Sequence, residues 1–146
     1  MADGFVVRRE THVPAPPATV FAFFTDPDKL MRWMGNGAMM EPHPGGLYLL
    51  QGVAGKATAR GTFKEVVPVH RLAYSFGWDH NADVPAGSSL IEIDLEERDG
   101  GTLVRLTHSG LPSEYERTEH EKGWTHYIDR LTKVLSGEAV GPDKRG

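Results

Sequence analysis

Histidines are the residues of this sequence that most directly suggest metal binding or acid–base catalysis, and there are seven of them. His120 and His126 fall on one predicted helix, with Glu121 directly after the first. A separation of six residues turns them roughly 240° apart around a helix, so both cannot hold one ion. The HExxH motif of zinc enzymes needs its histidines four residues apart. We therefore expect no metal site.

His108 is of more interest, because it shares a predicted strand face with Val104 and Leu106. That alternation points its imidazole toward the interior of the protein. The side chain is then either a titratable group at a cavity or a core or rim histidine satisfied by hydrogen bonds. His43, between Pro42 and Pro44, is predicted to be exposed.

Catalytic motifs are weak in this sequence. General acid or base roles are open to His108, Tyr74, Tyr127 and Glu65. None of these is spaced with another as a recognisable dyad, and there is no serine nucleophile elbow or Walker A loop. The stretch 35–37, Gly-Asn-Gly, lacks the third glycine and the helix of a dinucleotide site. We expect no catalytic residue set and no cofactor.

The composition fits one domain of 146 residues. The absence of cysteine excludes disulfides, thiol nucleophiles and zinc-thiolate or iron–sulfur sites. A net charge of −4, from 16 Lys and Arg against 20 Asp and Glu, gives no long-range attraction to nucleic acid or to an anionic membrane. The start lacks a secretory signal, and no stretch approaches the ~20 apolar residues that span a bilayer. We predict a cytoplasmic protein.

Apolar periodicity predicts two short helices and six strands before one long helix. Pro16 opens a helix over 16–24, and Pro27 opens a second with Leu30, Trp33 and Met34 on its apolar side. Strands are predicted at 5–13, 47–51, 58–66, 72–78, 91–95 and 102–108. The last two strands form the clearest hairpin, with an Asp-Gly turn at 99–100.

The long helix begins at Ser113, which matches a capping box with Glu116, and Gly137 suits its C-terminal end. Its apolar stripe predicts that it lies across the sheet. Gly123 inside the helix predicts either a close backbone approach or a kink. We expect one domain over 1–139 and a flexible tail over 140–146.

Several short motifs, taken in their order and spacing, are typical of one family. They include Pro14-Ala15-Pro16, Thr25-Asp26-Pro27, Trp33-Met34-Gly35, Pro44-Gly45-Gly46, Gly61-Thr62-Phe63-Lys64-Glu65-Val66 and Leu106-Thr107-His108-Ser109-Gly110-Leu111-Pro112. On these residues the chain resembles the stand-alone bacterial form of the family named for the activator of heat-shock protein 90 ATPase, within the START/Bet v 1-like (SRPBCC) superfamily. The resemblance implies an α+β helix-grip fold, in which a curved six-stranded antiparallel sheet grips a long C-terminal helix over an apolar cavity, with two short helices beside it.

The residues themselves make the cavity plausible, because Ala57, Ala59 and Gly61 leave volume on the face that the helix should cover. The predicted lining combines flexible thioethers, aromatic rings and one imidazole. Its members are Trp33, Met34, Met39, Phe63, Tyr74, Phe76, Trp78, His108, Trp124 and Tyr127. Ordinary core packing is the alternative for each of them.

The favoured function is binding of a small hydrophobic or amphipathic molecule in this cavity. The resemblance also implies two alternatives, a cavity-based enzyme of cyclase-like or hydrolytic type and a regulator of a chaperone ATPase. An accessory role in stress response is a third. The identity of the ligand stays open, as does the choice between a monomer and a homodimer.

Overall fold

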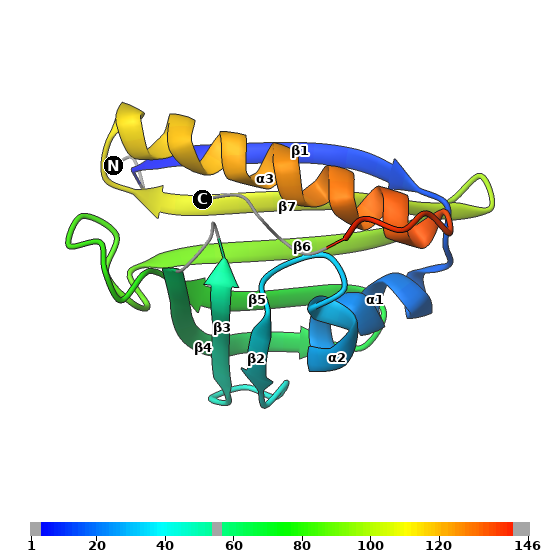
Figure 1. Ribbon diagram of the computed structural model, residues 1–146, viewed down its shortest axis with the longest axis horizontal. Helices are drawn as coiled ribbons and strands as arrows, with labels where there is room; N and C mark the ends of the chain where they lie inside the picture. Colours follow the sequence, from blue (N-terminus) through cyan, green and yellow to red (C-terminus); the bar gives the residue numbers. More distant parts are fainter. Residues whose placement is uncertain (1–3, 54–56, 142–146) are drawn as a thin grey trace.

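Seven antiparallel strands form one sheet in the computed structural model, which describes residues 4–53 and 57–141. The strands lie in the order β1-β7-β6-β5-β4-β3-β2, with α3 packed across one face (Figure 1). Their bounds are β1 Phe5–Val13, β2 Gly37–Met40, β3 Leu47–Val53, β4 Ala57–Val67, β5 Arg71–Phe76, β6 Ser89–Arg98 and β7 Gly101–Leu111. The helices are α1 Pro17–Thr25, α2 Pro27–Leu30 and α3 Glu114–Leu135.

The prediction of six strands was one short, because β2 was not foreseen. This edge strand has only four residues, and it pairs with β3 from Gly37 opposite Gln51 to Met40 opposite Tyr48. The sequence Gly-Ala-Met-Met has no alternation of apolar and polar residues, which is the signal by which a strand is recognised. The α+β helix-grip architecture is otherwise the predicted one.

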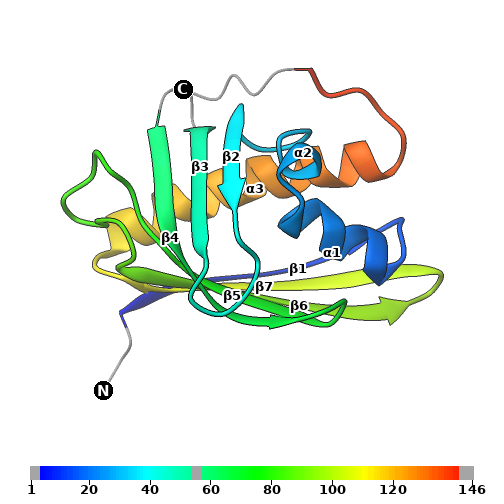
Figure 2. The same cartoon turned by 90° about the horizontal axis from the view of Figure 1, so that it is seen from below.

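The sheet bends sharply along β4. Residues of β4 up to Thr62 pair with β3, and those from Phe63 onward pair with β5. Figure 2 shows the consequence, since β2 and β3 stand nearly upright against the plane of β5, β6, β7 and β1. Gly61 lies at the bend, where a Cβ would overlap the carbonyl oxygen of Ser75. Glycine is needed there because the backbones of β4 and β5 approach each other closely.

The β6–β7 hairpin is the longest pairing in the sheet and confirms the predicted turn. Arg98 pairs with Gly101, and the two residues between them, Asp99 and Gly100, have φ of 51° and 78°. Positive φ at both central positions matches the twist of the two strands. The two-residue loop sets the register, which places Ile91, Ile93 and Leu106 on the buried face.

Proline and aspartate start the two short helices. Pro17 is the first residue of α1, and Pro27 the first of α2. Asp26 caps α2 by accepting hydrogen bonds from the backbone N–H of Asp28 and Lys29. The buried face of this pair ends in Trp33, whose ring meets Phe24 edge to face and whose Nε1 donates to the carbonyl of Phe23.

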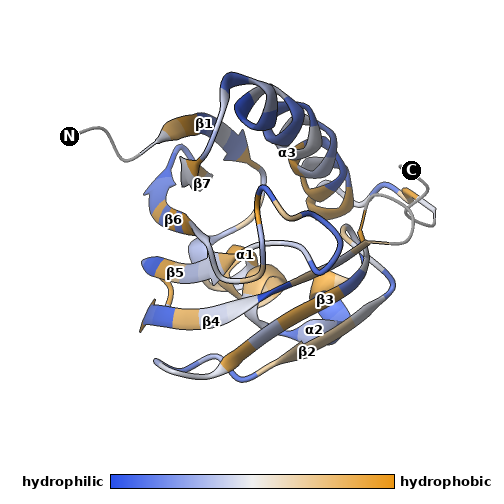
Figure 3. Cartoon of the chain, turned by 90° about the vertical axis from the view of Figure 1, so that its left-hand side faces the viewer, coloured by the Kyte–Doolittle hydropathy of each residue, from blue (hydrophilic) through white to orange (hydrophobic). Residues whose placement is uncertain are grey.

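Helix α3 has 22 residues and is capped by Ser113, which precedes it and accepts a hydrogen bond from the backbone N–H of Glu116. Its buried stripe includes Trp124, Ile128 and Leu131, and its outward turns carry hydrophilic residues (Figure 3). Hydrophobic burial along that stripe holds the helix on the sheet.

Arg130 ties the end of the chain to the core. Its Nε donates to the carbonyl of Trp33 at 2.8 Å, and its two terminal nitrogens donate to the carbonyls of Val140 and Gly141. The first two residues of the predicted tail are therefore held by hydrogen bonds. The rest of that tail, 142–146, lies outside the described residues.

Candidate functional site

A cavity of about 250 Å³ lies between the N-terminal half of α3 and the bend of the sheet. Its walls come from α3, from the end of β5 with the loop after it, from the facing ends of β3 and β4, and from the segment after α2. Because the bend turns β3 and β4 toward α3, these elements enclose a space that a flat sheet would not form.

The inner wall is apolar and mainly aromatic. It is formed by Met34, Val53, Ala57, Phe76, Trp78, Trp124 and Tyr127. The indole N–H groups are occupied within the protein, since Trp78 Nε1 donates to His120 Nε2 and Trp124 Nε1 donates to His108 Nδ1, both at 3.0 Å. The two tryptophans are held in place by these bonds.

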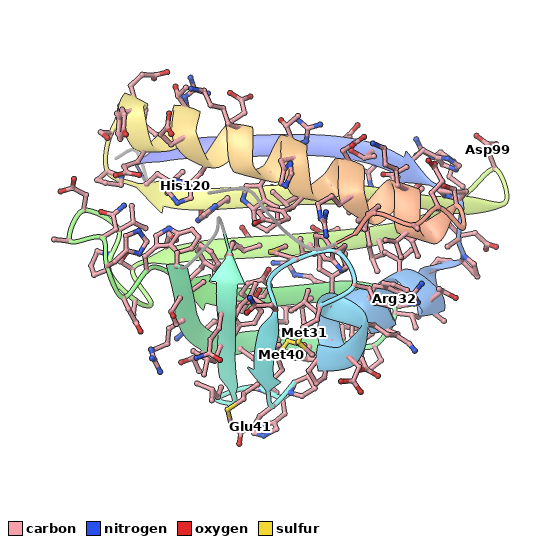
Figure 4. The ribbon with its side chains drawn as sticks, in the orientation of Figure 1. Met31, Arg32, Met40, Glu41, Asp99 and His120 are labelled. Carbon is pink, nitrogen blue, oxygen red and sulfur yellow. The ribbon has the colours of Figure 1, made fainter. Side chains whose placement is uncertain are left out.

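The outer part of the cavity is polar. It is formed by His80, Asn81, Tyr115, Glu116, Glu119 and His120. Figure 4 shows His120 on the side of α3 that faces the sheet. Its Nε2 accepts from Trp78, so the proton lies on Nδ1, which donates to the backbone carbonyl of Glu116 at 2.7 Å. Among the described residues, no lysine or arginine lines this space.

Glu116 is the buried acid of this rim, with only 5% of its surface exposed. Its Oε2 accepts a hydrogen bond from Asn81 Nδ2 at 3.3 Å, and its Oε1 lies 3.6 Å from His120 Nδ1. Asn81 in turn accepts, through its side-chain oxygen, from the backbone N–H of Asp83. The start of α3 and the loop after β5 are thus joined through the carboxyl group of Glu116.

His108 lies directly beneath the aromatic wall and is fully buried. Its Nδ1 accepts from Trp124, so Nε2 carries the proton and donates to Ser89 Oγ at 2.8 Å. Burial, with His120 nearby as the smaller cause, lowers the pKa of His108 to about 3. This is the satisfied core histidine, one of the two roles left open by the sequence.

The direction of these bonds excludes Ser89 as a serine activated by His108. Ser89 accepts from the imidazole and donates its own hydroxyl proton to the carbonyl of Phe76 at 2.7 Å. A catalytic base must instead accept the proton of its nucleophile.

Two of the other acid–base candidates also lie away from the cavity. Glu65 is on the outer face of the sheet, bonded to Arg71 at 2.8 Å. Tyr74 is buried against Tyr48, and that burial raises its pKa well above 10.0. Tyr127 does line the cavity.

Of the ten residues predicted to line the cavity, the structure brings together Met34, Phe76, Trp78, Trp124 and Tyr127. Trp33, Phe63, Tyr74 and His108 are buried in the core instead. Phe63 and Tyr74 pack with Tyr48, which stacks on Tyr74 with ring centroids 4.2 Å apart. Phe76 joins the two groups, since its ring contacts both Tyr48 in the core and Trp78 at the cavity.

Met39 lies outside the cavity and the core, with 60% of its surface exposed. The reason is the alternation of β2, in which Met40 pairs with Tyr48 on the buried face and Met39 therefore points to the other face. Because β2 was not predicted, this alternation was not available from the sequence.

The small residues have roles that differ from those predicted. The space beside Gly61 is filled by the backbone of β5, and Ala59 is fully buried, so neither hollows the cavity. Gly123 makes no close backbone approach, because a Cβ placed there would meet nothing within 4 Å. Gly123 lines the cavity, and with Ala57 it supplies part of its volume.

The polar rim was missed. The sequence pattern indicates a capping role for Glu116 and, for His120, only a possible metal ligand. The usable signal was the spacing of Glu116, His120, Gly123, Trp124 and Tyr127, which places them along one side of a helix. Within the described ranges there is no group of three metal-ligating side chains, and no helix there is long and apolar enough to cross a bilayer.

Comparison with known proteins identifies relatives over nearly the whole chain. A solution structure of an AHSA1-like protein from Rhizobium etli is 65% identical, covering 95% of this chain and 86% of that one, with a TM-score of 0.76. CalU16 from Micromonospora echinospora is 29% identical, covering 90% of this chain and 74% of that one, with a TM-score of 0.69. DynU16, a protein in the dynemicin biosynthetic locus, shares the fold at 21% identity and a TM-score of 0.80, covering 94% of this chain and 50% of that one.

No curated protein matches the chain significantly. The model of the family described as "Activator of Hsp90 ATPase homolog 1-like protein" matches residues 14–136. That range includes both short helices, strands β2 to β7 and all of α3. With this match and the Rhizobium etli relative, the chain belongs to the Activator of Hsp90 ATPase homolog 1-like family.

Proposed function

We propose that this protein binds a small, largely apolar molecule in the cavity between α3 and the bent sheet. The observation that carries the proposal is that Phe76, Trp78 and Trp124 line an open space of about 250 Å³. Aromatic side chains in a core normally pack against protein atoms, whereas these form the apolar wall of a concave site whose polar groups are gathered at its rim, as in small-molecule sites.

The energetics favour an apolar ligand over water in this cavity. The cavity opens to solvent at its rim, where Tyr115 is 69% exposed, so water can enter it. An apolar ligand that displaces this water gains ~25 cal/mol for each Å² of apolar surface it buries. DynU16 lies in a biosynthetic locus, and the shared fold supports a role that involves small molecules.

The test is thermal unfolding in the presence of a library of small aromatic, alicyclic and acyl compounds. A ligand at one hundred times its dissociation constant stabilises the folded state by about 2.7 kcal/mol. For a domain of this size that raises the melting temperature by roughly 5–10 °C. Native mass spectrometry of freshly purified protein, with a retained small-molecule mass as the expected result, identifies a natural ligand.

Gly123 offers a matched pair of variants. Gly123→Leu fills the open space at this helix position, and Gly123→Ala adds only one methyl group. Binding should be lost in Gly123→Leu and largely kept in Gly123→Ala, with both variants folded. The proposal is wrong if no compound in the library shifts the melting temperature. It is also wrong if the compounds that bind the wild type bind Gly123→Leu equally tightly.

A further inference from the structure

Glu116 places a buried carboxyl group at the edge of the cavity. Only 5% of its surface is exposed, and it lines the cavity at the boundary between the aromatic wall and the polar rim. Its backbone N–H donates to Ser113, as a capping box requires. Its carboxyl group takes no part in the cap and is bonded to Asn81 instead.

The side-chain partners of this carboxyl group are an amide and an imidazole. The bond from Asn81 to Oε2 is long, at 3.3 Å. His120 lies 3.6 Å from Oε1, but it receives the indole N–H of Trp78 on Nε2 and directs Nδ1 to the backbone carbonyl of Glu116. Among the described residues, no lysine or arginine is paired with Glu116.

Carboxyl groups are rarely buried without a charged partner, because loss of water is costly for the ionised form. The other carboxyl group of the described lining, Glu119, is paired with Lys122 outside the cavity, so Glu116 is the one carboxyl group of that lining without a lysine or arginine partner among the described residues. The polar end of the cavity is therefore suited to a positive charge.

The aromatic wall lies directly beside this carboxyl group. Trp78 packs against His120, the residue that bonds to the Glu116 backbone, and both tryptophans line the cavity. An ammonium group at Glu116 would thus be recognised by the carboxyl group while its apolar body contacts the aromatic wall.

We propose that the cavity selects amines, namely molecules with an apolar body and a protonated amino group that pairs with the Glu116 carboxyl group. This inference rests on the proposed function and adds the ligand class and the residue that selects it.

The test compares three probes with the same body and different heads: 3-phenylpropylamine, 3-phenylpropan-1-ol and 3-phenylpropionate. Affinities are measured by calorimetry with the wild type and with Glu116→Gln, which keeps the shape of the side chain and an acceptor for Asn81. The wild type should bind the amine at least tenfold more tightly than the alcohol, and the carboxylate most weakly. In Glu116→Gln the affinity for the amine should fall to about that for the alcohol, while the affinity for the alcohol should stay the same.

Glu121→Gln is the control, since it removes a carboxyl group of the same helix that does not line the cavity. Retention of the amine preference in Glu121→Gln and its loss in Glu116→Gln support the proposal, and the opposite pattern overturns the assignment to Glu116. The comparison of probes on the wild type does not depend on any variant folding. If the amine and the alcohol bind equally well and Gly123→Leu blocks both, amine selection is wrong but the proposed function stands. If neither the probes nor any library compound binds, both proposals are wrong.

Discussion

The indole N–H of Trp124 is directed at Nδ1 of His108, 3.0 Å away in the core beneath the cavity. A second proton on that imidazole would have to occupy the position of the indole hydrogen. The contact therefore fixes a neutral tautomer, and burial lowers the pKa of His108 to about 3.

The first prediction is a pH dependence of stability that depends on His108. Its pKa is about 3 in the folded state and about 6.5 in an unfolded chain. Because the folded value is the lower one, this contribution is fully present above pH ~6.5 and is lost as the pH falls toward 3, by about 1.4 kcal/mol per pH unit. Urea unfolding between pH 7 and 5 should show this slope in the wild type and a flatter one in His108→Gln.

His43→Gln is the control for that measurement, because His43 is exposed. Its stability curve should run parallel to that of the wild type. If the stability curve of His108→Gln also runs parallel to that of the wild type, the buried neutral imidazole is not the cause of the change in stability with pH.

The second prediction is that two Gly→Ala substitutions change the stability of the protein in opposite directions. Gly123→Ala adds a methyl group in open space within a helix and should stabilise the protein by about 1 kcal/mol. Gly61→Ala would push a methyl group into the Ser75 carbonyl and should destabilise it by about 2 kcal/mol or more. Thermal unfolding of both variants checks this, and a destabilised Gly123→Ala would contradict the open space at position 123.

The third prediction concerns Arg71, which bonds Glu65, Glu92 and Asp94 on the outer face of the sheet. Replacing Arg71 with Met leaves three carboxyl groups of adjacent strands without their shared cation. The expected loss is about 1 kcal/mol at low salt, since the groups are partly exposed. The loss should shrink in 1 M salt, which screens the remaining repulsion, and a loss that is independent of salt would point to packing of the side chain instead.

The fourth prediction concerns Arg130, which donates hydrogen bonds to the carbonyls of Trp33, Val140 and Gly141. In Arg130→Lys a single ammonium group replaces the planar guanidinium group, and it cannot reach all three carbonyls at once. We expect a loss of about 2 kcal/mol and greater backbone mobility at Val140 and Gly141, measured by NMR relaxation, because their carbonyl groups lose the bonds that hold them. Lys133→Ala removes only an exposed pair with Asp129, and it should change neither measurement appreciably.

The fold could be predicted from the sequence because its signals are local and periodic. The Asp99-Gly100 turn, the Ser113 cap and the apolar stripe of α3 each specify geometry within a few residues. β2 was missed because Gly-Ala-Met-Met has no such period. It becomes a strand only by pairing with β3, which the sequence pattern does not reveal.

The candidate site was predictable only in part, for a different reason. Apolar periodicity identifies Trp78 and Tyr74 alike as inward-facing, but only the bend at β4 decides that Trp78 borders a cavity and Tyr74 packs on Tyr48. Glu116 shows the same limit, since its position predicts a helix cap. The loop that brings Asn81 to it is folded by contacts distant in sequence.

The pairing of the first strand with the last has a consequence for how the chain folds. Phe5 pairs with Leu111 and Val13 with Thr102, so β1 cannot join the sheet until β7 exists. Such long-range pairing slows folding, because the entropy of closing the loop is lost before the contacts form. During synthesis the apolar residues of β1 are made before those of β7 and are buried late, whereas the β6–β7 hairpin can form on its own. We therefore expect folding to begin in β5, β6 and β7 and to end when β1 pairs at the edge of the sheet.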